Sequence, residues 1–156
     1  MAKDLQKKRE ARKNIERYHL VDKVTIIDAL VQRFGAPALE TIHEARALLM
    51  QNLWKEVADG AKDNSIETLI DTLWSEEFFD YTFTKDKDGK TKMNVSWCLF
   101  AELAKELDMQ ELAFEILCVD DQYICEGFNS NIEFTRTKTL MEGHDCCDHC
   151  YCYKTK

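Results

Sequence analysis

The stretch FDYTFTKDKDGKTKMNVSW, residues 79–97, decides the fold class of this chain. Aromatic residues at 79, 81 and 83 alternate with Asp or Thr, and Met93, Val95 and Trp97 alternate with polar residues in the same way. A period of two is typical of a strand with one buried face, and Asp88-Gly89 between the two runs is typical of a hairpin turn. We therefore expect an antiparallel hairpin here.

Before this hairpin the apolar residues follow a helical period instead. Three helical segments are predicted, over 4–18, 21–34 and 37–58. Gly35 ends the second segment, and Pro37 suits the first turn of the third. A fourth helix is expected to begin with Asn64 as its N-cap, because Glu67 then falls at the N3 position of a capping box.

After the hairpin, helical and strand patterns alternate. We expect helices over 99–107 and 109–125 and strands over 132–139 and 146–153. Gly127 is expected to stop the second of these helices. The sequence thus predicts an α+β fold, a helical N-terminal half packed on an antiparallel sheet built from two strand pairs. One domain is expected over 1–156, with a basic helix at 1–18, a helical part at 20–78 and a mixed part at 79–156.

The composition indicates the cellular location in which this chain functions. Of its 156 residues, 45% are hydrophobic and 32% are charged, which is typical of a soluble globular protein. No run approaches the ~20 apolar residues of a membrane span, so we expect no membrane partner. The N-terminal residues Met1-Ala2-Lys3-Asp4 lack the apolar core of a signal peptide, which favours a cytoplasmic location.

Charge is unevenly distributed. Residues 1–17 carry seven Lys/Arg and three Asp/Glu, whereas the rest of the chain carries 14 and 26. An acidic body repels nucleic acid, so no nucleic-acid partner is expected. The short basic helix is interpreted as a solvated face or as an arm through which the chain forms a homo-oligomer.

The chain has seven cysteines, an odd number, and this argues against a disulfide framework in a reducing compartment. In the helix before Gly127, Cys118, Asp121 and Cys125 recur at offsets of three and four and so share one face. A thiolate there could act as a nucleophile with Asp121 as base. The alternative is that the thiols are small core residues and Asp121 is a surface charge.

Arg136 follows the alternation of its strand onto the apolar face of Ile132 and Phe134. A guanidinium on such a face must be paired, because an isolated buried charge costs several kcal/mol. Its planar fork suits a carboxylate. The sequence leaves two partners open, an internal Asp or Glu and the carboxylate of an amino-acid-like ligand.

The tail at 144–152 holds imidazole and thiol groups of the kind that bind zinc. Strand alternation spreads them along an extended segment, and no second Cys-x2-Cys pair completes a zinc ribbon. The sequence therefore requires no cofactor, and zinc or another metal is kept as an alternative. Its ligands would be His144, Cys146, Cys150 and Cys152.

The last third of the chain carries a further pattern. Its members are Cys118, Asp121, Glu126-Gly127-Phe128-Asn129, Arg136-Thr137-x-Thr139, Met141-Glu142-Gly143 and Cys147-Asp148, with Cys98 upstream. This order resembles the C-terminal signature of the L-2-amino-thiazoline-4-carboxylic acid hydrolase family. Cys146, His149, Cys150 and Cys152 depart from that signature.

The resemblance implies a hydrolase of non-peptide C–N bonds that opens a small cyclic amidine such as 2-aminothiazoline-4-carboxylate. The implied catalytic residues are Cys118, Asp121, Cys98, Cys147 and Asp148, and the implied substrate-binding residues are Arg136, Thr137, Glu142, Phe128 and Asn129. Either a thiolate attacks the amidine carbon or Asp121 activates water. The other hypothesis is a non-enzymatic domain that binds a small molecule or metal, or senses redox state, through its tail cysteines.

Overall fold

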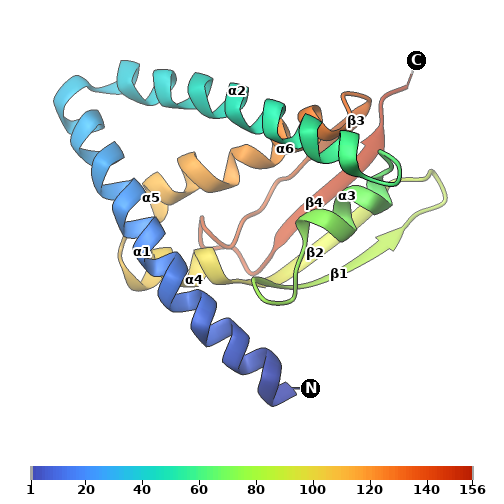
Figure 1. Ribbon diagram of the computed structural model, residues 1–156, viewed down its shortest axis with the longest axis horizontal. Coiled ribbons are helices and arrows are strands. Elements are labelled where there is room, and N and C mark those ends of the chain that lie inside the picture. Colours follow the sequence, from blue (N-terminus) through green and yellow to red (C-terminus); the bar gives the residue numbers. More distant parts are fainter. Residues whose placement is uncertain (1, 156) are drawn as a thin grey trace.

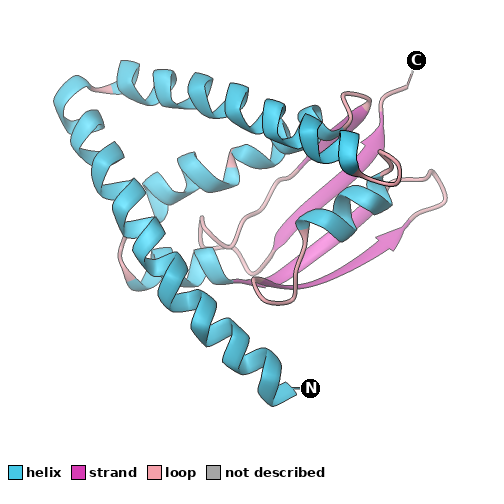
Figure 2. Cartoon of the chain, in the orientation of Figure 1, coloured by secondary structure: helices cyan, strands magenta, loops and turns pink. Residues whose placement is uncertain are grey.

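The computed structural model describes residues 2–155, and within them the helical and strand segments divide as the sequence predicts for an α+β fold (Figures 1 and 2). The helices are α1 (Ala2–Phe34), α2 (Ala36–Gly60), α3 (Ile66–Leu73), α4 (Leu99–Glu106), α5 (Gln110–Ala113) and α6 (Asp120–Phe128), with a π-helical turn η1 (Phe114–Cys118). The strands are β1 (Phe79–Lys85), β2 (Thr91–Cys98), β3 (Ile132–Thr135) and β4 (Cys147–Tyr153). The predicted fold class is confirmed.

All four strands form one antiparallel sheet in the order β1-β2-β4-β3. Both predicted strand pairs are present, and pairing of β2 with β4 joins them. The order itself could not be read from the sequence, because it depends on contacts between distant segments. In this order β4 is a central strand. Four of the seven cysteines lie in β4 or directly before it.

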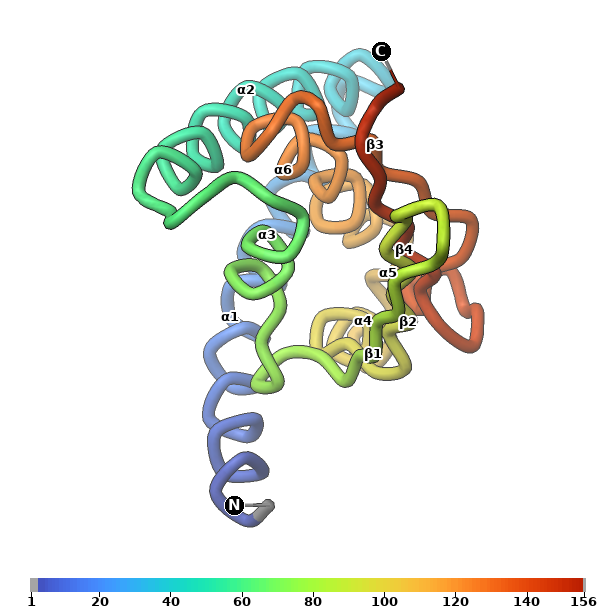
Figure 3. The backbone as a smooth tube through the Cα atoms, turned by 90° about the vertical axis from the view of Figure 1, so that its right-hand side faces the viewer, coloured from blue at the N-terminus to red at the C-terminus, as the bar shows by residue number. Residues whose placement is uncertain are grey.

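The helices gather on one face of the sheet (Figure 3). On that face Met93, Val95 and Tyr151 are nearly inaccessible to solvent and pack against α3 residues such as Leu69 and Ile70. On the other face the strand residues are exposed or half-buried. A second apolar cluster joins α1 to α4, α5 and η1. Within residues 2–155 no helix is long and apolar enough to cross a membrane.

The two helical patterns at 4–18 and 21–34 prove to be one helix, α1. No glycine or proline interrupts residues 2–34, and Leu20 and Val24 are buried where the two patterns meet. The basic half of α1 is paired within the chain: Arg9 with Asp80, Arg12 with Glu77, Lys13 with Glu102 and Glu106, and Arg17 with Glu106. Assembly with a second copy through α1 stays a prediction.

The expected N-cap of α3 is wrong by one residue. Ser65, not Asn64, has the extended cap conformation, and its Oγ accepts the Thr68 N–H at 3.2 Å. Asp63 accepts hydrogen bonds from the Ser65 N–H and hydroxyl, which fixes Ser65 in that position. Both residue types are good caps, so the choice depended on Asp63.

The helix expected over 109–125 is divided into α5, η1 and α6. The Val119 N–H donates to the Phe114 carbonyl at 3.2 Å, a bond five residues back that widens the turn. Gly127 does not stop the helix as expected but lies inside α6. A Cβ there would fall 2.5 Å from the Gln51 carbonyl oxygen, so Gly127 permits α2 and α6 to touch along their backbones.

Candidate functional site

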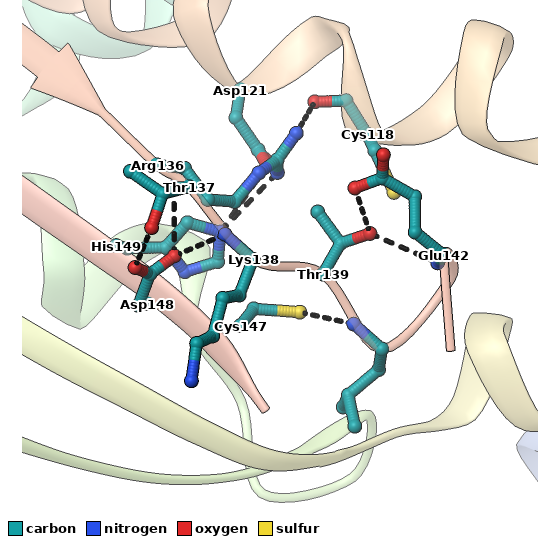
Figure 4. A network of polar contacts seen from close by, with 11 residues as sticks. Cys118, Asp121, Arg136, Thr137, Lys138, Thr139, Glu142, Cys147, Asp148 and His149 are labelled. Atoms are coloured by element: carbon teal, nitrogen blue, oxygen red, sulfur yellow. Dashed lines mark hydrogen bonds and ion pairs between the residues drawn. The ribbon is translucent and has the colours of Figure 1, made fainter. Parts of the chain in front are cut away.

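The loop at 136–146, which joins β3 to β4, carries most of the motif, and Asp148 holds its first residues (Figure 4). Its carboxylate accepts the Thr137 hydroxyl at 2.6 Å and the N–H groups of Thr137 and Lys138 at 2.8 and 2.6 Å. Burial alone would raise the pKa of Asp148, but the Thr137 and Lys138 donors outweigh it and lower that pKa. The carboxylate is therefore already engaged in shaping the loop.

The Met141-Glu142-Gly143 turn is fixed by Thr139. The buried Thr139 hydroxyl donates to Glu142 Oε2 at 2.8 Å and accepts the Glu142 N–H at 3.0 Å. Gly143 has a φ of 87°, a left-handed conformation that favours glycine. Met141 is buried, which anchors the turn that carries the Glu142 side chain.

Arg136 is paired internally, the first of its two predicted alternatives. One guanidinium nitrogen donates to Asp121 and the other donates to the Cys118 carbonyl at 3.1 Å. The side chains of Arg136 and Asp121 are 10% and 19% exposed. His149 Nε2 lies 3.5 Å from the same Asp121 oxygen. The arginine thus ties the end of η1 and the first turn of α6 to the sheet.

The structure brings Cys98, Cys118 and Cys147 together with Asp121 and Arg136, although they lie on different elements. Cys118, Asp121, Arg136 and Cys147 lie side by side in Figure 4, and burial together with the charges of Asp121 and Arg136 shifts the pKa of Cys118. Cys147 Sγ accepts the N–H of Leu140 at 3.2 Å. Their catalytic role stays a prediction.

Burial controls the ionisation of these thiols. It raises the pKa of Cys98 to about 12, although the N–H groups of Phe100 and Ala101 at the start of α4 partly offset it. Burial also raises the pKa of Cys118 and of Cys147. All three are therefore neutral thiols at neutral pH, and a neutral thiol is a poor nucleophile.

A cleft of about 880 Å³ opens beside this cluster. Its walls are the end of β2, α4, α5 and η1 on one side and the turn at 140–144 on the other. Cys98 and Glu142 both line it, as does Phe114, whose ring lies 5.9 Å from the Arg136 guanidinium. Of the residues described, Cys118 and Cys147 do not line the cleft, so Cys98 is the motif cysteine that a ligand there would meet.

The charged groups of the cleft are mostly carboxylates. Glu102 is held by Lys13 and by the Trp97 indole N–H at 2.7 Å, and Glu115 lies 3.0 Å from His43 Nε2. Glu142 has only the Thr139 hydroxyl as a side-chain partner among residues 2–155. Lys105 and His144 supply the basic groups of the lining.

Of the five predicted substrate-binding residues only Glu142 lines the cleft; Arg136 and Thr137 are engaged as described above, and Phe128 and Asn129 lie elsewhere. Phe128 is 2% exposed and packs edge-on against Trp54, with ring centroids 6.2 Å apart. Asn129 donates to the Asn64 carbonyl at 2.8 Å and accepts the Asn131 N–H, so it fixes the turn after α6. Both residues have structural contacts, and neither lines the cleft.

The tail residues do not form a metal centre of three or more ligands. Across residues 2–155 no three His, Cys, Asp or Glu side chains are grouped so that they could hold an ion. His144 and Cys146 precede β4, whereas Cys150 and Cys152 lie within it. A bend at Asp145 lies between His144 and Cys146, and the extended backbone of β4 lies between Cys146 and the other two.

Sequence reasoning missed His149, which was not assigned to the site. Its ring is 3% exposed, its Nε2 lies 3.4 Å from an Arg136 nitrogen, and its Nδ1 is buried without a partner in the described chain. The ring centroid of Trp74 lies 5.0 Å away, and its buried Nε1 also has no partner there. The sequence indicated neither that His149 lies on the buried face of β4 nor which groups surround it.

Together, the fold and site define a small α+β protein with a ligand-sized cleft lined by a cysteine and carboxylates. More particularly, the chain belongs to the L-2-amino-thiazoline-4-carboxylic acid hydrolase family, whose sequence model matches residues 12–151. A comparison with curated proteins gives no match.

Among solved structures, an H-NOX protein from S. oneidensis in the Fe(II)NO ligation state is similar over 85% of this chain and 74% of its own. The sequence identity is 13% and the TM-score is 0.47, values too low to support a conclusion about function.

Proposed function

We propose that this protein hydrolyses a C–N bond of a small, carboxylate-bearing cyclic amidine, with 2-aminothiazoline-4-carboxylate as the substrate that the family name suggests. The observation that carries the proposal is the cleft in which Glu142 of the motif turn faces the same space as Cys98. A cationic amidine suits the surrounding carboxylates. Lys105 and His144 are the basic groups available to the substrate carboxylate, because Arg136 is engaged by Asp121.

The ionisation of the site favours attack by water over attack by a thiolate. Burial holds the pKa of Cys98 at about 12, Asp121 is engaged by Arg136, and Asp148 accepts three hydrogen bonds from Thr137 and Lys138. Glu142 is the carboxylate best placed to accept a proton from water. The water oxygen then bonds to the amidine carbon, the ring C–N bond breaks, and the leaving nitrogen takes up a proton. The product is a carbamoyl-cysteine.

The direct test is incubation of the purified protein with 2-aminothiazoline-4-carboxylate and detection of carbamoyl-cysteine by mass spectrometry. Glu142→Gln should lower turnover by about 10²–10⁴-fold, the usual contribution of a general base. Cys98→Ser should retain part of the turnover, and Cys150→Ser is the matched control because that thiol lies outside the cleft.

Three outcomes would correct the proposal. Complete loss of turnover in Cys98→Ser, with an intact fold, would favour the covalent route through the thiol. Full activity of Glu142→Gln would remove that residue from the mechanism. A ligand-induced rise in melting temperature without product would favour the non-enzymatic binding domain.

A further inference from the structure

Cys150 and Cys152 are not used by the cleft and lie together on β4. Residues i and i+2 of a strand point to the same face, and the buried residues Cys147, His149 and Tyr151 occupy the other face. The two thiols are therefore on the sheet face that the helices leave open, which is seen edge-on in Figure 3. Both side chains are half-buried.

We propose that Cys150 and Cys152 form a two-coordinate site for a soft monovalent metal ion such as Cu(I), separate from the cleft. The juxtaposition of two thiols on one strand face carries the inference. It is independent of the hydrolytic function proposed above.

The spacing of the thiols fits a bridging ion better than a disulfide. Two residues along a strand are about 7 Å apart at their Cα and Cβ atoms, whereas a disulfide needs Cβ atoms about 3.5–4.5 Å apart. Two metal–sulfur bonds of about 2.3 Å each, the length of a zinc–thiolate bond, span up to about 4.6 Å. When the two side chains rotate toward each other, their sulfur atoms come closer together than their Cβ atoms, so the strand does not need to bend.

Two lysines and one glutamate lie around the pair. Lys92 is the direct β2 neighbour of Cys150, and cross-strand neighbours on one face lie about 4.5–5.5 Å apart at their Cβ atoms. Burial and the adjacent Glu133 raise the pKa of Cys152, and Lys90 lowers it. Binding replaces two S–H protons by one monovalent ion, so a complex of net charge −1 forms beside two lysines. No electron is transferred.

The softness of the ligands selects the ion. Thiolates prefer Cu(I) to hard cations, and a linear two-sulfur geometry satisfies Cu(I). Zinc requires four ligands, and among residues 2–155 there is no group of three or more His, Cys, Asp or Glu side chains that could hold an ion. Glu133 Oε2 lies 3.7 Å from Cys152 Sγ but is an oxygen ligand, which a soft ion does not prefer.

The test is anaerobic titration of the full chain with Cu(I) against a chromogenic Cu(I) chelator. The wild type should hold one more equivalent than the Cys150→Ser/Cys152→Ser double variant. Either single substitution should weaken that equivalent by about 10²–10⁴-fold, because it removes the chelate effect. Cys146→Ser is the matched control and should leave the binding unchanged.

Alkylation of the wild type provides a second measurement. Bound Cu(I) should protect Cys150 and Cys152 from iodoacetamide while leaving Cys146 reactive, as read from peptide masses. Equal Cu(I) uptake by the wild type and the double variant would overturn the proposal. So would a metal that Cys146→Ser or His144→Ala releases, because that result would indicate a larger ligand set.

Discussion

At the residue scale, Arg136 has the largest structural role in the motif. Its guanidinium contacts the Asp121 carboxylate, the Cys118 carbonyl and, at 3.4 Å, His149 Nε2. These groups belong to α6, η1 and β4. The motif arginine therefore determines where the thiol cluster lies relative to the cleft, even though it does not line the cleft itself.

Replacement of Arg136 tests this role. Arg136→Met should lower the free energy of unfolding by about 3–5 kcal/mol, because it leaves the mostly buried Asp121 carboxylate without its partner. Arg136→Lys should cost less, since it keeps the charge but loses the fork. Urea denaturation measures both, and Lys138→Met is the control at an exposed cation. A loss below about 1 kcal/mol in Arg136→Met would show that the pair adds little.

The lowered pKa of Asp148 gives a pH prediction. A carboxyl whose folded pKa lies below its usual 3.8 stabilises the fold above that pH, and the contribution disappears as pH falls through the folded value. The loop at 136–146 should thus lose amide protection on acidification below about pH 4. Asp148→Asn should be less protected at neutral pH and show a weaker change. An acid response equal to that of the wild type would assign the effect to other carboxyls.

The sequence predicted most residues of the site but not the hydrogen bonds and ion pairs that they form. The family pattern listed Cys147 with Cys98 and Cys118, but the sequence did not indicate that Cys147 lies on the buried face of β4. The pairing of Arg136 with Asp121 rather than with another carboxyl, and the presence of His149 beside them, depend on strand order. Strand order is a long-range property that residue types do not encode locally.

At the element scale, α2 and α6 form the closest helix pair of the molecule. None of the residues of α2 is fully buried, yet it packs along α6 more extensively than any other pair of helices. The contact is possible because Gly127 has no side chain at the point where α6 meets the Gln51 backbone. Arg46 and Asp120 add a mostly buried ion pair between the same two helices.

A glycine pair tests this packing. Gly127→Ala places a methyl group 2.5 Å from the Gln51 carbonyl oxygen, so α6 must move, at a cost of about 1–3 kcal/mol for overpacking. Gly60→Ala is the control, because a Cβ there meets nothing within 4 Å and alanine favours a helix. Thermal melts should separate the two variants clearly. Equal stability would mean that the helices have room to separate.

Period and turn chemistry predicted the kind of most elements, and two of the differences have a local cause. The cap of α3 shifted from Asn64 to Ser65 because Asp63 holds Ser65. The η1 turn interrupts a helical pattern that is continuous in the sequence. Arg136 donates a hydrogen bond to the carbonyl of Cys118, the last residue of this turn. Both depend on a single side-chain contact, which a hydrophobic period does not report.

At the scale of the whole molecule, α1 lies across the helical layer and is held in two different ways. Leu20 and Val24 anchor its middle in the apolar cluster with α4 and η1. Its first half is attached through the ion pairs of Arg9, Lys13 and Arg17 with acidic residues of β1 and α4. Most of the basic side chains of this segment are thus paired within the chain.

Salt should therefore loosen one half of α1 and leave the other half in place. Screening shortens the range of exposed charge interactions to about 3 Å at 1 M salt. Amide exchange at 4–17 should accelerate from low salt to 1 M NaCl, whereas exchange near Leu20 and Val24 and throughout α3 should change little. Stacking of Arg9 on Trp97, at 4.3 Å, is apolar in part and should keep the segment near the body.

Acid provides an independent version of the same experiment. The hydrogen bond from Lys13, with that from Trp97, holds the pKa of Glu102 below its usual 4.5. The ionised Glu102 therefore contributes fully to the stability of the fold above that pH, and this stabilisation is lost as pH falls through the folded pKa. Exchange at 4–17 should accelerate at pH 3 after correction for intrinsic rates, and Glu102→Gln should reproduce part of this acceleration at neutral pH. If protection along α1 stays uniform under both treatments, apolar contacts hold the entire helix and the ion pairs are incidental.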